Sequence, residues 1–112
     1  MKKVEAIIRP EKVEETRKAL AKAGYPGMTI TEVEGHGKQK GVIQQWRGET
    51  YKVDLLPKVK IEVVITDTEV DNIASTIAAA AKTGAVGDGK IFITDIKDAI
   101  RIRTGESGDV VL

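Results

Sequence analysis

The sequence contains no cysteine and only one histidine among its 112 residues. The lack of cysteine excludes a disulfide framework and a thiolate metal site, and one histidine makes a poor metal site. No run of about 18 apolar residues occurs, and charged residues interrupt the first ten positions, so neither a membrane-spanning helix nor an export signal is expected. These absences favour a cytoplasmic protein.

A large excess of one charge is also lacking. Eighteen basic and seventeen acidic residues give a net charge of +1, so no overall field favours nucleic acid or an anionic membrane as a partner. Any anion-binding site must therefore be local. With 41% hydrophobic residues, a chain of this length can bury one core, and we expect a single domain over residues 1–112.

Four segments have the pattern of β-strands. Residues 3–9 and 58–66 alternate between apolar and polar side chains, which predicts strands with one buried face. Residues 28–34 and 90–96 are rich in threonine, isoleucine and valine, which also favour strands. Four strands are therefore predicted.

Two segments have the pattern of α-helices. After Pro10, which the first turn of a helix tolerates, apolar residues recur at helical spacing until Gly24. Residues 70–81 carry one continuous apolar stripe. Thr66, followed three residues later by Glu69, is a capping-box pattern, so we expect Thr66 to cap this second helix.

The predicted order is strand, helix, strand, strand, helix, strand. This βαββαβ order is the split βαβ arrangement of α+β ferredoxin-like folds, in which two helices cover one face of a four-stranded antiparallel sheet. The other face would be bare and carry Ile7, Val64 and Phe92, so we expect an oligomer. Between strands two and three, residues 35–52 form an unusually long loop, which is either functional or an unstructured insertion.

Residues 83–90, "TGAVGDGK", satisfy the first part of the P-loop pattern. Ile91 then replaces the hydroxyl residue of that pattern, and a predicted strand replaces the helix whose N-terminus would bind phosphate. If the loop binds phosphate, other parts of the chain must complete the cradle. Asp88 would repel phosphate, so it either holds a turn or contacts a sugar or a magnesium-bound water.

Two arginines are candidates for completing the cradle. Arg101 and Arg103 are two residues apart in a segment that we expect to be extended, which places both side chains on one side. Guanidinium groups bind phosphate through two parallel donors. We expect these arginines to converge with Gly87, Gly89 and Lys90 on one anion; the alternative is that they are solvated edge residues.

The motifs "MKKVEAIIRPEK", "GMTITEV", "GHGKQKG", "LLPKVKIE", "TGAVGDGKIF" and "RIRTGE" occur in this order along the whole chain. In this respect the sequence resembles the PII nitrogen-regulatory signal-transduction family. The resemblance implies a cytoplasmic homotrimer without enzymatic activity that binds ATP or ADP between subunits and 2-oxoglutarate beside magnesium-ATP. It also implies that residues 35–52 are the T-loop, the segment that docks on targets such as ammonium transporters, which would bring the protein to the membrane, or nitrogen-assimilation enzymes.

The resemblance assigns roles to individual residues. Nucleotide-binding positions are implied for Thr29, Gly37, Lys38, Glu62, Val64, Gly87, Asp88, Gly89, Lys90, Arg101 and Arg103. The implied 2-oxoglutarate contacts are Gln39, Lys58 and Gly87, and Gln39 would ligate magnesium through its carbonyl oxygen. Arg47 would contact the partner. Tyr51 is the possible site of nucleotidylylation, although its surroundings, "WRGETY", depart from the family pattern.

Other functions are compatible with the same fold class. One is an adenine-nucleotide sensor without a 2-oxoglutarate response, and another is a weak nucleotide-hydrolysing enzyme on the same fold. Hydrolysis would need a positioned base and magnesium-binding carboxylates, whereas the glycine loop offers only Asp88. An acylphosphatase-like enzyme would need an anion-binding loop between the first strand and the first helix, together with a partner asparagine. That junction reads "RPEK" here, and the only asparagine is Asn72.

Overall fold

The structure, a computed structural model, describes residues 1–35, 42–46, 49–53 and 56–112, and it describes side chains outside residues 36–55. The main sheet contains β1 (Lys2–Ile8), β2 (Thr29–Gly35), β5 (Leu56–Ile65) and β6 (Lys90–Asp95). The helices are α1 (Val13–Lys22) and α2 (Val70–Ala81), with 3-10 turns η1 (Pro10–Lys12), η2 (Asp67–Glu69) and η3 (Asp109–Val111). Among these described helices, none is long and apolar enough to cross a membrane.

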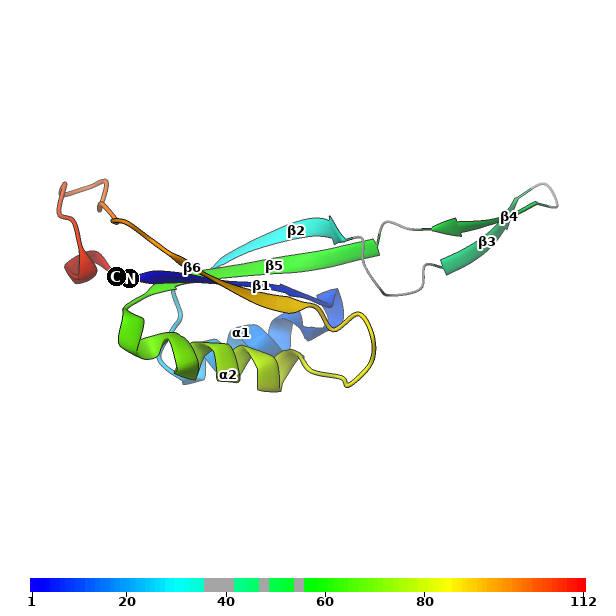
Figure 1. Ribbon diagram of the computed structural model, residues 1–112, viewed down its shortest axis with the longest axis horizontal. Helices are drawn as coiled ribbons and strands as arrows, with labels where there is room; N and C mark the ends of the chain where they lie inside the picture. Colours follow the sequence, from blue (N-terminus) through cyan, green and yellow to red (C-terminus); the bar gives the residue numbers. More distant parts are fainter. Residues whose placement is uncertain (36–41, 47–48, 54–55) are drawn as a thin grey trace.

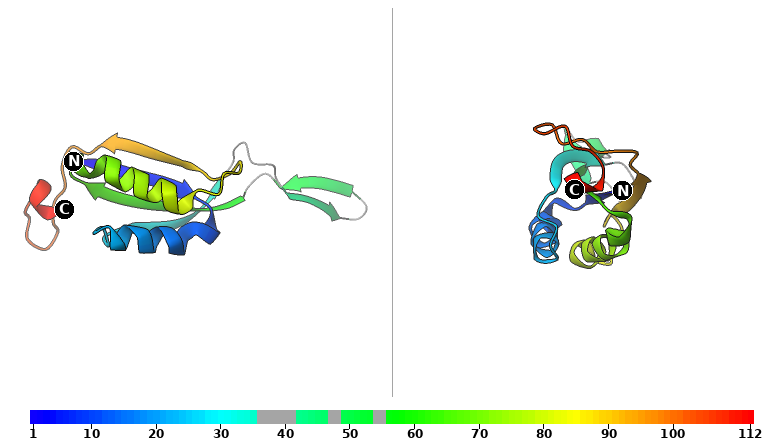
Figure 2. Two further views of the ribbon diagram at one scale, coloured as in Figure 1. Left: turned by 90° about the horizontal axis from the view of Figure 1, so that it is seen from below. Right: turned by 90° about the vertical axis from the view of Figure 1, so that its left-hand side faces the viewer.

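The strands are arranged in the order β2-β5-β1-β6, and every neighbouring pair is antiparallel. Both helices lie on the same face of this sheet (Figures 1 and 2). Each helix connects two parallel strands that are separated by an antiparallel strand, which is the split βαβ arrangement. The predicted α+β ferredoxin-like fold is confirmed.

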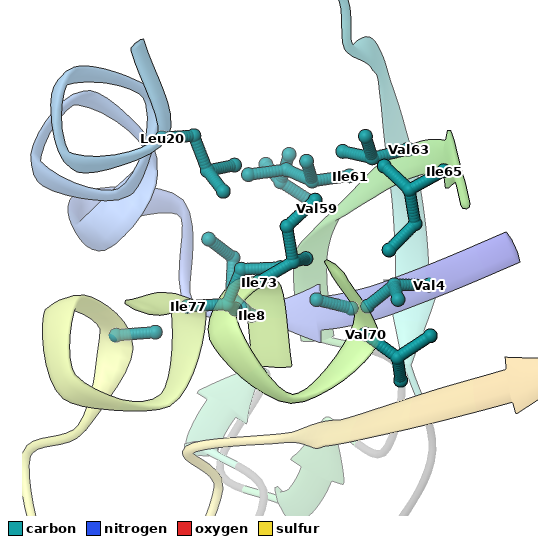
Figure 3. Close-up of a cluster of buried hydrophobic side chains, with 12 residues drawn as sticks. Val4, Ile8, Leu20, Val59, Ile61, Val63, Ile65, Val70, Ile73 and Ile77 are labelled. Atoms are coloured by element: carbon teal, nitrogen blue, oxygen red, sulfur yellow. The ribbon is translucent and has the colours of Figure 1, made fainter. Parts of the chain in front are cut away.

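The core lies between the sheet and the two helices (Figure 3). Alternation along β1 and β5 directs one set of side chains toward the helices, namely Val4, Ala6, Ile8, Val59, Ile61, Val63 and Ile65. Leu20 of α1 and Ile73 and Ile77 of α2 are fully buried against them. Complete burial of such a side chain is worth roughly 1.5–3 kcal/mol, so the apolar stripes hold both helices on the sheet.

The opposite sheet face carries apolar and charged side chains together. Glu5 of β1 pairs with Phe92 of β6, and Ile7 pairs with Lys90. Phe92 remains 48% exposed. The helix-free face therefore has the apolar residues expected from the sequence, and oligomerisation through it remains a prediction.

The expected capping box at the start of the second helix is wrong. Thr66 precedes η2 and makes no side-chain hydrogen bond to the helix backbone; its hydroxyl lies 3.3 Å from that of Thr68. The Glu69 carboxylate instead accepts a hydrogen bond from the Tyr25 hydroxyl. The Glu69 carboxylate, which the local pattern assigns to the helix cap, therefore forms a tertiary hydrogen bond with Tyr25 instead.

Within the long loop, β3 (Val42–Trp46) and β4 (Glu49–Val53) form a second, two-stranded antiparallel sheet. No strand was expected here. These strands pair only with each other, so the sequence need not show the alternation that a buried face imposes. The hairpin appears beyond the ends of β2 and β5 in Figure 1.

Candidate functional site

The glycine loop, residues 83–90, connects α2 to β6 and passes directly against the end of β1. Gly89 has φ +100°, and a Cβ atom at this position would lie 1.6 Å from the Ile7 carbonyl oxygen. Gly87 also has a positive φ of 102°. Only glycine avoids both the steric overlap and the strained backbone conformation at position 89, so the loop backbone can approach the sheet closely.

Asp88 holds this loop in shape. Its carboxylate accepts hydrogen bonds from the backbone N–H groups of Thr83 and Gly84, each at 2.8 Å, and from the Thr83 hydroxyl. These contacts, led by the Thr83 hydroxyl, hold the pKa of Asp88 well below its usual range. Asp88 therefore holds a turn, and its contact with a sugar or a magnesium-bound water stays a prediction.

Arg9 binds the loop from the end of β1. Its Nε donates to Asp88 Oδ1 at 3.0 Å, and its terminal NH2 group donates to the Val86 carbonyl oxygen at 2.8 Å. The side chain is only 14% exposed. Arg9 was not among the residues expected from the sequence; the available signal was its position before Pro10, which restricts Arg9 to an extended conformation.

Lys58 of β5 binds the same glycine loop from the base of the long loop between β2 and β5. Its ammonium group donates to the Gly87 carbonyl oxygen at 2.7 Å. Its stem passes over Gly35, where an added Cβ atom would lie 2.8 Å from Lys58 Cγ. Burial, together with the nearby positive charge of Arg9, lowers the pKa of Lys58. The structure therefore joins two of the expected 2-oxoglutarate contacts, Lys58 and Gly87.

The hydrogen bonds from Arg9 to the Val86 carbonyl and from Lys58 to the Gly87 carbonyl determine which way two backbone N–H groups of the loop point. In a planar trans peptide, the N–H group points opposite to the carbonyl oxygen of the preceding residue. Because the carbonyls of Val86 and Gly87 face Arg9 and Lys58, the N–H groups of Gly87 and Asp88 face away from these cations. Neither N–H group donates a hydrogen bond to the described part of the chain. Such outward amides can bind an anion without a helix N-terminus.

The residues expected to hold adenine lie together on the helix-free face. Thr29 of β2 pairs directly with Glu62 of β5, and Val64 follows two positions later on the same face. The Glu62 carboxylate is 3.2 Å from the Lys60 ammonium and 3.8 Å from that of Lys3.

Arg101 and Arg103 lie at the other end of the sheet. Along β6, Lys90 is opposite Ile7 and Asp95 is opposite Lys2, so the chain leaves β6 near the N-terminus (Figure 1). Within one chain the arginines therefore do not meet the glycine loop, because a full strand length separates them. Their convergence on one anion stays a prediction that needs a second subunit.

The segment that carries these arginines is not extended either. Residues 102–104 form a turn, closed by a 2.8 Å hydrogen bond from the Gly105 N–H to the Arg101 carbonyl. The Arg101 guanidinium forms a 2.7 Å ion pair with Glu106.

A mostly apolar hollow of about 270 Å³ lies between the end of α2 and the glycine loop, where Ile77, Ala78, Gly89 and Lys90 line it. This is below the usual volume of small-molecule sites, about 300–1,000 Å³. Two groups of expected site residues lie at opposite ends of the sheet: the glycine loop with Lys58 at one end, and Arg101 with Arg103 at the other.

The remaining residues expected at the site belong to the long loop between β2 and β5. Gly37, Lys38, Gln39 and Arg47 lie outside the described residues, and Tyr51 is described only through its backbone position in β4, opposite Gln44. In the described part of the chain, no three histidine or acidic side chains gather to hold a metal ion.

Comparison with known proteins shows similarity along the whole chain. The family model described as nitrogen regulatory protein P-II matches residues 1–106. Nitrogen regulatory protein P-II 2 of Methanothermobacter thermautotrophicus is 56% identical over 108 residues, covering 96% of this chain and 94% of that protein. P-II proteins of Klebsiella oxytoca and Escherichia coli are each 54% identical over 112 residues, covering 100% of both chains.

Proposed function

Because the chain belongs to the nitrogen regulatory protein P-II family, we propose that it senses ATP or ADP together with 2-oxoglutarate and controls nitrogen metabolism through target proteins. Members of this family are regulatory proteins that bind adenine nucleotides as effectors and act on targets. The observation that carries the proposal is the glycine loop, whose amides face outward while Arg9 and Lys58 bind its carbonyls.

The nucleotide site is completed between neighbouring subunits of a trimer. Gly87, Gly89 and Lys90 of one subunit contact the phosphates, and Arg101 and Arg103 come from the next subunit. This arrangement is supported by the position of the two groups at opposite ends of one sheet. Lys38 adds a further phosphate contact, and Gly37 lies beside it. Adenine rests on the helix-free face near Thr29, Glu62 and Val64.

The 2-oxoglutarate site adjoins the phosphates at the base of the T-loop. Lys58 neutralises the remote carboxylate of the keto acid, and its 2.7 Å bond to the Gly87 carbonyl places it beside the phosphate loop. Two carboxylates near a triphosphate would repel it strongly without a cation. Magnesium fits this donor set as a hard cation held by phosphate oxygens and the carbonyl oxygen of Gln39.

Ligand binding controls which targets the T-loop can engage. The two sites are coupled because each ligand favours particular conformations of a shared segment. Arg47 contacts the partner, an ammonium transporter or a nitrogen-assimilation enzyme, and Tyr51 is a candidate for modification. The protein acts in the cytoplasm and reaches the membrane only through a transporter.

Isothermal titration calorimetry tests this proposal. We expect ATP to bind, 2-oxoglutarate to bind in the presence of magnesium-ATP and more weakly with magnesium-ADP, and EDTA to abolish keto-acid binding. Linkage also requires that 2-oxoglutarate tighten ATP binding by the same factor by which ATP tightens 2-oxoglutarate binding. Equal keto-acid binding under all conditions would contradict the shared site. Binding of ATP without any keto-acid response would leave an adenine-nucleotide sensor.

A further inference from the structure

Arg9 lies behind the glycine loop, on the side to which the loop carbonyls point. We propose that Arg9 is a positioning residue of the phosphate site, which makes the glycine loop receptive to a polyphosphate without contacting the phosphate. This inference rests on the proposed function, because it concerns the same loop. It is carried by two hydrogen bonds in two directions, to Asp88 and to Val86.

The first contribution of Arg9 is to balance a negative charge inside an anion site. Asp88 lies between Gly87 and Gly89, so its carboxylate is close to any phosphate that the loop binds. Arg9 Nε is 3.0 Å from Asp88 Oδ1, and an adjacent cation reduces the repulsion between this carboxylate and phosphate. Among the side chains that the structure describes, a second acid near Arg9 is Glu11, whose carboxylate is 4.0 Å away and 66% exposed. Asp88 is therefore the closer partner.

The second contribution is to orient a peptide group. The Arg9 guanidinium holds the Val86 carbonyl at 2.8 Å, which turns the N–H of Gly87 to the opposite side of the peptide plane. Lys58 does the same for the next peptide by binding the Gly87 carbonyl. Phosphate bound to these N–H groups would lie on the side of the loop away from Arg9. Arg9 would therefore not be a direct phosphate ligand.

Arginine has the geometry for both tasks at once. Its planar guanidinium presents several donors in fixed directions, whereas lysine offers one compact ammonium on a flexible stem. The low exposure of Arg9, 14%, and the extended conformation at this position keep the group in place. A lysine would keep the charge near Asp88 but would not hold the Val86 carbonyl in the same geometry.

The test is calorimetric titration of the full chain with ATP, ADP and AMP at constant magnesium. The variants are Arg9→Gln and Arg9→Lys. The matched control is Arg17→Gln, which removes the same type of side chain from an ion pair of similar length, 2.8 Å to Glu14, on the exposed side of α1. Thermal unfolding of each variant verifies that it is folded.

We expect Arg9→Gln to weaken ATP binding about 10- to 100-fold, the range for a lost charge-assisted contact. The loss should be smaller for ADP and smallest for AMP, because repulsion from Asp88 grows with phosphate charge. Arg9→Lys should fall between Arg9→Gln and the unmodified protein. Arg17→Gln should bind all three nucleotides normally. If Arg9→Gln does not fold, the charge-retaining Arg9→Lys variant supports the same comparison.

A double variant separates the charge effect from general damage to the loop. Asn at position 88 retains an oxygen acceptor for the N–H groups of Thr83 and Gly84 but carries no charge. Arg9→Gln combined with Asp88→Asn should therefore bind ATP more tightly than Arg9→Gln alone.

Three results would overturn the inference: equal ATP affinity of Arg9→Gln and Arg17→Gln, equal losses for ATP and AMP, or no recovery in the double variant. Failure of the unmodified protein to bind ATP would instead overturn the proposed function, and this inference with it.

Discussion

At the scale of single residues, the glycine loop depends on contacts that leave no space for a side chain. Gly89 combines a positive φ with a position in which any Cβ would overlap the Ile7 carbonyl oxygen. Gly27 has neither constraint, since no heavy atom lies within 4 Å of its Cβ position. The two glycines therefore form a matched pair for testing the role of close backbone approach.

We predict that Gly89→Ala lowers the free energy of unfolding by about 2–5 kcal/mol, because backbone strain adds to steric overlap. Gly27→Ala should change it by less than about 1 kcal/mol. Urea denaturation followed by circular dichroism measures both values. Similar stabilities for the two variants would mean that the loop does not pass against β1 as described.

The low pKa of Asp88 makes its contribution to stability depend on pH. Since the folded-state pKa lies below the usual value, the carboxylate stabilises the folded protein fully above about pH 4, the ordinary pKa. That contribution is lost as the pH falls further toward the folded-state pKa.

We predict that Asp88→Asn lowers the melting temperature at pH 7, and that the difference from the unmodified protein shrinks between about pH 4 and pH 2. Differential scanning calorimetry measures both proteins across this range. Asp71→Asn, on the exposed surface of α2, controls for the loss of one charge. A difference for Asp88→Asn that stays constant down to pH 2 would contradict the assigned hydrogen bonds.

At the scale of elements, the start of the second helix shows a local pattern that a tertiary contact overrides. Tyr25, after α1, donates to Glu69 and also accepts a hydrogen bond from Asn72 in α2 at 3.1 Å. These two hydrogen bonds connect the C-terminal end of α1 to the N-terminal end of α2. The Thr66 side chain makes no capping hydrogen bond to the helix backbone.

We therefore predict that Thr66→Ala changes the free energy of unfolding by less than about 0.5 kcal/mol, the usual range for substitutions that remove no core contact or cap. A true N-cap would cost about 1 kcal/mol on the same change. Thr68→Ala, which removes the other member of the hydroxyl pair, should have an equally small effect. Chemical denaturation that gives a loss of 1 kcal/mol or more for Thr66→Ala alone would restore the capping box.

At the scale of the whole molecule, the proposed nucleotide site would require a second subunit, because the glycine loop and Arg101 with Arg103 lie at opposite ends of one sheet. The exposed apolar residues of the C-terminal segment, including Ile102 at 100% and Val110 at 67%, lie near Arg101 and Arg103 in the sequence. Burial of these side chains against a neighbour would add stability to the assembly.

We predict a trimer of the 12.1 kDa chain, measured by light scattering at micromolar concentration. Arg103→Ala should weaken ATP binding by about 1.5–3 kcal/mol, the value of a hydrogen bond to a charged group, and leave the trimer intact. A monomer mass would contradict the assembly, and unchanged ATP affinity would remove Arg103 from the site.

Mixed trimers test whether neighbouring subunits share each site. We predict that Arg103→Ala and Lys90→Ala proteins each bind ATP weakly alone, whereas co-refolded mixtures regain tight sites. In a cyclic trimer of both types, about one site in three combines an intact loop with an intact arginine. Calorimetry of the mixture gives the fraction of tight sites. No recovery in verified mixed trimers would show that each site is built by one chain.

Local sequence patterns were enough to predict the strands of the main sheet, both helices and the glycine loop. Their patterns are local: alternation in residues 58–66 and the apolar stripe of residues 70–81 follow directly from the geometry of strands and helices. The order of these elements then leaves few ways to bury the apolar faces, which is why the ferredoxin-like fold was predictable.

The contacts within the candidate site, in contrast, follow from the three-dimensional fold. Arg9 and Asp88 are 79 positions apart, so their ion pair exists only because β1 ends beside the loop that precedes β6. The antiparallel direction of β6 likewise carries Arg101 and Arg103 away from that loop. Contacts of this kind depend on strand order and direction in space, which a periodic pattern in one segment does not encode.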